Sequence, residues 1–250
     1  MQKGKVASFL FFAVLSAGIL AGASAADVSL GLPGVLHFVV QLAMVVASLL
    51  WVTWHGDRPA VKHKMLALTW VGLVPALLHV FACYGPINNP IVADYVWDGL
   101  STVVSAIWVA IFYFGVGFSL LMVKGKLTTA GRVMMIVAFG LPALAGIFVP
   151  GAHLTDGIFH ALIAFSMGAF LTVAYEGSGK LWVPITLYLA YYTVDALFRC
   201  GSSEFASFGT PVYIVVFICN IMLYAVGAFY LARHLTQKRP KGKHRPAPKA

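Results

Sequence analysis

Seven long apolar stretches, separated by short polar or glycine- and proline-containing segments, dominate the hydropathy pattern of this chain. They cover residues 33–54, 65–84, 95–123, 129–150, 157–175, 181–198 and 211–233. A helix needs about 20 residues to cross the ~30 Å hydrocarbon core of a bilayer, so each stretch has roughly the required length. Lipid offers no hydrogen-bond partners to the backbone N–H and C=O groups, so we expect each stretch to be a helix, in which these groups bond to one another. The pattern predicts an all-α protein, a bundle of seven transmembrane helices.

Positive charge gathers on one side of this predicted bundle. Of the 17 lysine and arginine residues, only Arg199 lies outside the N-terminal leader or the segments that follow spans 1, 3, 5 and 7. Acidic residues lie on or near the opposite side: Asp27, Asp94, Asp98, Asp156, Asp195 and Glu204. Segments rich in lysine and arginine are typically cytoplasmic. We therefore expect span 1 to begin outside and the C-terminus to lie in the cytoplasm.

The first 25 residues have the form of a secretory signal peptide. A basic start precedes the apolar run Val6–Leu20 and the small residues Ala23-Ser24-Ala25, the usual order of such a signal. An uncleaved eighth helix or signal anchor is the alternative. Residues 26–236 are then one membrane domain, and residues 237–250 a basic, disordered cytoplasmic tail attracted to anionic lipid.

Composition agrees with a membrane protein, since 60% of the residues are hydrophobic and 10% are charged. The net charge of +9 is mainly a topology signal, and the tail is too short to favour nucleic-acid binding. Cys83 and Cys200 lie near the outer ends of their spans, where either a disulfide or two buried thiols would fit. Phosphate-binding loops, catalytic triads and HExxH sequences are absent, so no enzyme is predicted.

The candidate chemistry lies in polar residues inside the apolar spans. An ionisable group at membrane depth costs at least ~2.5 kcal/mol, so each one is a candidate functional residue. The ionisable candidates are Asp98, Asp195, His37, His79 and His160, and the uncharged ones are Tyr191, Asn220 and Tyr224.

Several of these residues stand in motifs that resemble the microbial rhodopsins. Leu73-Val74-Pro75-Ala76, Asn89-Pro90-Ile91 and Tyr95 to Thr102 resemble the second and third helices of that family, and Leu187 to Tyr191 and Asn220 to Gly227, followed by Arg233, resemble the sixth and seventh. The resemblance covers most of residues 33–235. It implies a rhodopsin-like bundle with a ligand pocket formed by Asp98, Thr102, Tyr188, Tyr191, Asp195, Asn220 and Tyr224.

The chain lacks the lysine that binds retinal covalently in this family. The family's seventh helix carries an aspartate and, one turn later, the Schiff-base lysine, whereas this chain has Asn220 and Tyr224. A phenol cannot form an imine. Without a buried cation, a second carboxylate would be unpaired at a cost of several kcal/mol, which the amide of Asn220 avoids. No covalent cofactor is therefore expected.

Span 3 also departs from the pattern of proton pumps. Asp98 aligns with the family's counterion and proton acceptor, but Ile107–Ala110 occupies the place of the usual carboxylate donor. His79 is positioned near the outer end of span 2, where it could pair with Asp98. Alternatively, His79 would bond a backbone carbonyl and Asp98 would start its helix at the water interface.

The histidines suggest a rival interpretation. His37, His79, His153 and His160 map to the outer half of the bundle, where imidazoles on facing helices could ligate haem or a transition metal. They lack the matched-depth pairing typical of haem-binding helices, so no metal site is expected.

Together these features predict a non-enzymatic, opsin-like scaffold or sensor in a bacterial inner membrane. It would bind a hydrophobic ligand, such as retinal or a carotenoid, non-covalently, or a partner protein. The alternatives are a light-driven ion pump or photosensor with atypical chromophore attachment, and a haem- or metal-binding membrane protein. The expected partners are membrane lipids, the hydrophobic ligand, and a second copy or another membrane protein.

Overall fold

The computed structural model describes residues 3–32, 34–55, 63–83, 92–123, 126–145, 154–198 and 210–236. In chain order the elements are α1 (Lys3–Leu30), α2 (Val35–His55), α3 (His63–Thr69), η1 (Trp70–Gly72), α4 (Leu73–Cys83), α5 (Val92–Ala110), η2 (Ile111–Gly117), α6 (Phe118–Leu121), β1 (Met122–Val123), β2 (Lys126–Leu127), α7 (Thr129–Ala145), α8 (Leu154–Ser178), α9 (Trp182–Phe198) and α10 (Thr210–Thr236). Apart from the short antiparallel pair β1–β2, these elements are helical. The all-α prediction is confirmed.

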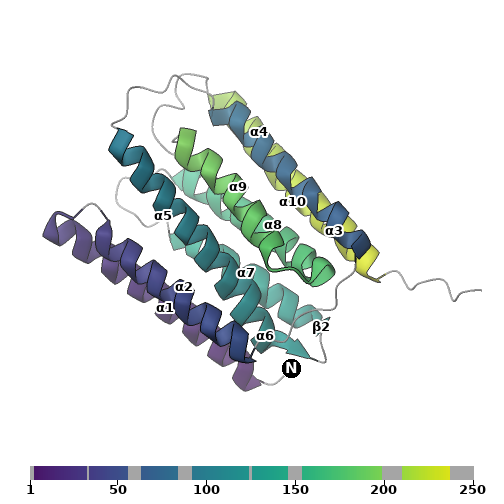
Figure 1. Ribbon diagram of the computed structural model, residues 1–250. Helices are drawn as coiled ribbons and strands as arrows, with labels where there is room; N and C mark the ends of the chain where they lie inside the picture. Colours follow the sequence, from purple (N-terminus) through teal and green to yellow (C-terminus); the bar gives the residue numbers. More distant parts are fainter. Residues whose placement is uncertain are drawn as a thin grey trace, which may run out of the picture.

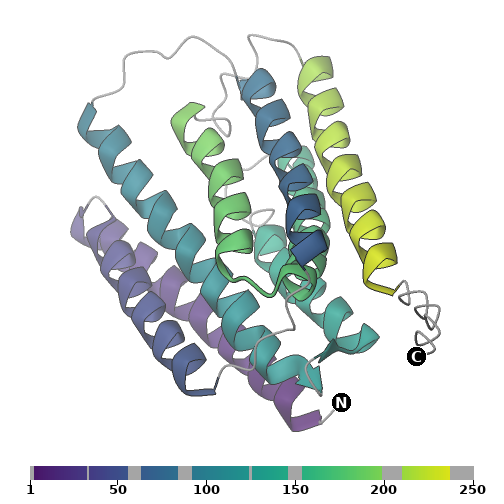
Figure 2. The ribbon, with the colours of Figure 1, turned by 45° about the vertical axis from the view of Figure 1, so that its right-hand side comes forward.

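Two of the predicted spans are composite rods. The second joins α3, the 3₁₀-helix η1 and α4, and the third joins α5, the π-helix η2 and α6. With each composite counted once, the described residues form eight rods, namely α1 and seven that coincide with the seven apolar stretches. Figures 1 and 2 show the rods side by side, each running opposite to the one before it.

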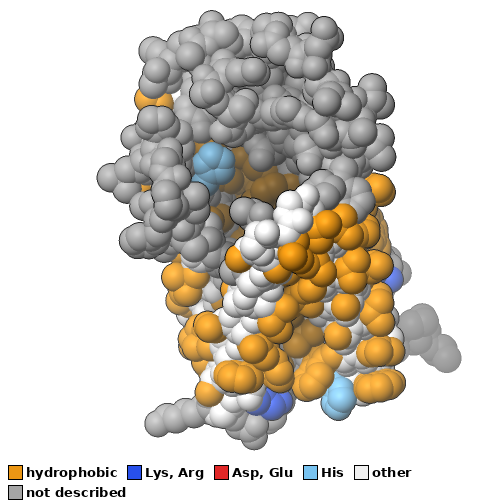
Figure 3. All heavy atoms as spheres, turned by 90° about the vertical axis from the view of Figure 1, so that its left-hand side faces the viewer, with side chains coloured by type: hydrophobic (Ala, Val, Ile, Leu, Met, Phe, Trp, Pro, Cys, Tyr) orange, Lys and Arg blue, Asp and Glu red, His pale blue; other side chains and the backbone are white. Residues whose placement is uncertain are grey.

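Five helical stretches in the described chain are long and apolar enough to cross a membrane. They are Gly4–Asp27, Val35–His55, Leu100–Leu121, Ile158–Ser178 and Ile214–Thr236, and two shorter apolar stretches cover Leu66–Leu78 and Thr129–Leu141. Hydrophobic side chains cover most of the described part of the face in Figure 3. The chain is therefore an integral membrane protein, while the count of seven crossings remains a prediction.

Most of the predicted signal peptide lies in α1, which continues through Ala25 and packs antiparallel to α2. Phe9 is fully buried, with its ring 6.3 Å from that of Phe112 in η2. The carboxylate of Asp27 accepts hydrogen bonds of 2.9 and 2.8 Å from the backbone N–H groups of Leu36 and His37, which caps the start of α2. Helix α1 packs here as an eighth rod, and its cleavage remains a prediction.

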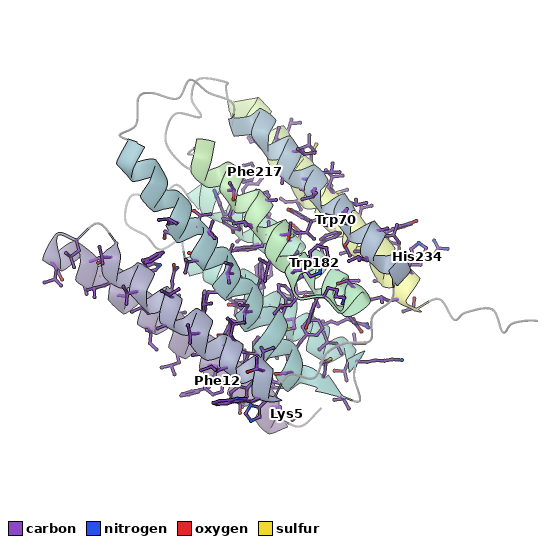
Figure 4. The ribbon with its side chains drawn as sticks, in the orientation of Figure 1. Lys5, Phe12, Trp70, Trp182, Phe217 and His234 are labelled. Carbon is purple, nitrogen blue, oxygen red and sulfur yellow. The ribbon has the colours of Figure 1, made fainter. Side chains whose placement is uncertain are left out.

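The chain reversals gather basic residues at one end of the bundle. Lys5 is near the start of α1, Arg132 is in the first turn of α7, and Lys180 separates α8 from α9. Arg233 is in the last turn of α10, near the labelled His234, and Lys5 lies at the same end (Figure 4). Asp27 lies at the opposite end. The spatial arrangement thus follows the charge partition of the sequence.

Helix α8 occupies the interior, with α7 on one side and α10 on another. Small and large residues interlock where α7 meets α8. A Cβ atom at Gly140 would lie 2.3 Å from the Phe165 ring, and one at Gly168 would lie 2.9 Å from the Phe139 ring. Glycines allow this close approach between helices in a membrane. Elsewhere, α9 packs against both α4 and α5, and α2 packs against α1, α5 and η2.

Candidate functional site

Helix α10 turns its polar residues towards the interior of the bundle. Its buried stripe, with the spacing of three and four expected for one helix face, consists of Phe217, Asn220, Tyr224, Ala228 and Leu231. The opposite face exposes Val215, Ile218, Met222, Val226 and Phe229. A polar interior and an apolar exterior are typical of a helix surrounded by lipid. Asn220 and Tyr224 therefore share one interior face, a turn apart.

Asn220 and Tyr224 carry three buried polar atoms that have no hydrogen-bond partner among the described residues. The atoms are Nδ2 and Oδ1 of Asn220 and the hydroxyl oxygen of Tyr224, and the two residues are 0% and 1% exposed. Each buried polar group left unpaired costs about 1–3 kcal/mol, and most buried polar groups in proteins are paired. This concentration of unpaired groups makes the two residues the candidate site.

Aromatic rings surround the Tyr224 side chain. The ring of Phe170 in α8 lies 5.8 Å from it, and the ring of Tyr191 in α9 lies 6.1 Å from it. Phe170 fits there because two glycines leave it room: a Cβ atom at Gly72 would lie 2.4 Å from its ring, and one at Gly227 2.9 Å. Phe170 and Tyr191 thus enclose the phenol ring between α8, α9 and α10.

The same pattern continues one turn before Asn220. There Phe217, labelled in Figure 4, packs against Phe159 at 5.8 Å and against His160 at 5.5 Å, both on α8. Asn220 is therefore preceded and followed on its helix face by aromatic residues that contact α8. The rings of Phe217 and Tyr224 on either side are largely apolar, and an apolar environment raises the cost of an unpaired amide.

Two of the sequence-predicted pocket residues, Tyr191 and Tyr224, are brought into contact. Tyr188 instead packs against Tyr192 at 4.4 Å and against Phe139 of α7 at 5.6 Å. Thr102 is half-buried on α5, which packs against α2 and α9, whereas α10 packs mainly against α8 and α4. Thr102 and Tyr224 therefore lie on rods with different principal neighbours.

Other predicted residues fall outside the described part of the structure. The side chains of His79, Asp98 and Asp195 are among them, so the pairing of His79 with Asp98 remains a prediction. The same holds for a disulfide between Cys83 and Cys200, for His153, and for the tail 237–250.

The described residues contain no group of three or more His, Cys, Asp or Glu side chains able to hold a metal ion, while haem ligation by two histidines stays an alternative. His37 has other partners. Its Nδ1 lies 3.3 Å from the carbonyl oxygen of Leu20, and its Nε2 accepts a 2.8 Å hydrogen bond from Gln41 Nε2. Gln41 Nε2 also donates to Ser105 Oγ at 2.7 Å. This network, which joins α1, α2 and α5, was not predicted from the sequence.

A second polar contact that the sequence analysis missed joins α7 to α8. Arg132 donates two hydrogen bonds of 2.8 Å to the carboxylate of Glu176, whose side chain is 8% exposed. Bidentate pairs of this kind combine charge attraction with fixed geometry. An acidic residue directly after an apolar stretch ending at residue 175 was the available signal, because such a residue needs a nearby cation.

Comparisons with family models, curated proteins and solved structures found no match. Fold and site together define a helical integral membrane protein in which Asn220 and Tyr224 are buried on α10 without hydrogen-bond partners among the described residues.

Proposed function

We propose that this protein binds a hydrophobic ligand non-covalently within the membrane, with the ligand's polar group at Asn220 and Tyr224. The three unpartnered polar atoms carry the proposal, because a ligand oxygen in hydrogen-bonding distance would remove part of their cost. The amide and the hydroxyl can each donate and accept. A ligand with one carbonyl or hydroxyl group on an apolar body fits this chemistry. Retinal or an oxygenated carotenoid is the ligand favoured by the resemblance to microbial rhodopsins.

Tyr191 closes the site on the side of α9, since its ring lies 6.1 Å from that of Tyr224. Helix α4 packs against both α9 and α10, so both rings are enclosed within the bundle. A rotation of the Tyr191 ring would make room beside Tyr224 for the polar group of a ligand, and the aromatic walls would hold the ligand's apolar body.

Covalent attachment and pumping are not part of the proposal, since α10 has no lysine and the segment Ala106–Leu121 has no carboxylate. The bundle would act as a ligand-binding scaffold or sensor rather than an enzyme. We place its basic end and its C-terminus in the cytoplasm of a bacterium, because positively charged ends of membrane helices are retained there.

Extraction of the purified protein with organic solvent, followed by mass spectrometry, tests the proposal. Wild-type protein should release a hydrophobic molecule that Asn220→Leu retains about tenfold less well, while the control Met222→Leu, on the exposed face of the same helix, should match wild type. Equal retention by all three would overturn the proposal. A Soret band in stoichiometric amount would favour the haem alternative instead.

Retinal itself is tested by adding the all-trans form to purified protein. Wild type should form no borohydride-trapped adduct, because no amine projects from α10. The double variant Asn220→Asp, Tyr224→Lys places an amine one turn from a carboxylate and should bind retinal covalently and absorb visible light. A folded double variant that stays colourless would argue against retinal as the ligand.

A further inference from the structure

A groove lies between α1, α2 and the third rod, away from the Asn220–Tyr224 site. Its volume is about 190 Å³, and its walls include Phe12, Leu15 and Ile19 from α1, Trp51 from α2, and Trp108 and Phe112 from α5 and η2. The lining is almost entirely apolar. Ser16, which also lines it, already donates its hydroxyl to the carbonyl of Ala13 at 3.0 Å. The Nε1 atom of Trp108 has no hydrogen-bond partner among the described residues, but it is itself buried and so is not exposed to the groove. The groove therefore suits a hydrocarbon rather than a polar ligand.

Fixed contacts on both sides keep the groove from closing. Towards the basic end, Phe9 and Val52 press onto η2, where a Cβ atom at Gly117 would lie 2.7 Å from Phe9 and one at Gly115 would lie 2.6 Å from Val52. Towards the other end, His37 ties α1 to α2 through Leu20, as described above. An unfilled gap between such fixed helices loses dispersion contacts, so an occupant would stabilise the bundle.

The surroundings of the groove identify the occupant. Phe12, Leu15 and Ile19 are 37%, 45% and 45% exposed, so the rim faces outward from the bundle. These residues lie near the middle of α1, about half a helix length from either headgroup layer, where lipid hydrocarbon is the surrounding medium. We propose that the groove holds one acyl chain of a membrane lipid. The proposal requires that α1 stays attached, because α1 forms one wall.

Native mass spectrometry in mild detergent tests this directly. Wild type should carry one bound phospholipid, and two groove-filling variants, Ala47→Phe and Ser16→Leu, should retain about tenfold less. The control Ala225→Phe, on the exposed face of α10, should retain lipid like wild type. Equal lipid retention by all four proteins would overturn the proposal. So would a purified chain whose mass begins after Ala25, or a dimer that the groove-filling variants dissociate.

Fluorescence gives an independent readout in vesicles of phosphatidylcholine brominated on its acyl chains. Trp108 is only 7% exposed, so bromine reaches it efficiently only through the groove. Its emission, obtained as the difference between wild type and Trp108→Phe, should be strongly quenched. Introducing Ala47→Phe into both proteins should abolish that quenching. Unquenched Trp108 in the wild-type background would refute an acyl chain in the groove.

Discussion

Replacing Tyr224 by phenylalanine isolates the hydroxyl group on which the proposed site depends. The ring contacts with Phe170 at 5.8 Å and Tyr191 at 6.1 Å remain available to phenylalanine, so only the unpartnered oxygen is lost. In protein stripped of ligand, removing an unpaired buried hydroxyl should raise the free energy of unfolding by about 1–3 kcal/mol. For a chain of this length each kcal/mol corresponds to roughly 2–4 °C in Tm.

The assay is thermal unfolding in detergent, followed by circular dichroism, with and without the extracted ligand. The ligand should raise the Tm of wild type but not that of Tyr224→Phe. Tyr224→Phe should therefore be the more stable protein without ligand, and wild type the more stable protein with it. Tyr230→Phe is the matched control, because Tyr230 lies on the same helix but is 50% exposed. This substitution should change the free energy of unfolding by no more than about 0.5 kcal/mol. If the stripped Tyr224→Phe protein is less stable than wild type, the hydroxyl has a partner and the reasoning fails.

Three further outcomes follow from the packing and the charges. Gly140→Ala should lower the free energy of unfolding by about 1–3 kcal/mol, because the added methyl group would meet the Phe165 ring. In a double-mutant cycle with Phe165→Ala the two effects should be coupled, and additive effects would contradict the contact. Glu176→Gln should lower Tm by leaving Arg132 without its charged partner, and an unchanged Tm would show that the pair contributes nothing. A reporter fused after Arg233 should read cytoplasmic, and one inserted between α4 and α5 should read external; swapped compartments would refute the orientation.

Hydropathy alone was sufficient to predict the rods from α2 to α10, because a helix in lipid is defined by the length of its apolar run. It left open whether the first apolar run, which forms α1, is a signal peptide or an eighth helix. Spacing was also sufficient to place Asn220 and Tyr224 on one face, since residues four apart lie one turn from each other. Burial of that face followed from the cost of exposing an amide to hydrocarbon. Neither inference depends on knowing which helices are neighbours.

Neighbour relations could not be predicted from the same pattern. Apolar side chains pack against lipid about as readily as against other helices, so the sequence does not indicate that α9 packs against both α4 and α5. The pairing of Arg132 with Glu176 joins residues 44 positions apart, which local periodicity cannot detect. The switches to 3₁₀ geometry at Trp70–Gly72 and to π geometry at Ile111–Gly117 also lacked a sequence signal, because apolar residues fit all three kinds of helix.

The π-helical segment has a consequence for changes in chain length. Its hydrogen bonds close wider turns than those of an α-helix, so η2 holds more residues for the same rotation. Deleting one residue within Ile111–Gly117 would let the backbone tighten into α-helix and absorb the loss locally. The same deletion within α5 would turn everything on one side of it by about 100° and move Trp108 or Ser105 away from its contacts. We therefore expect this rod to tolerate shortening at η2 and not in the α-helical turns before it.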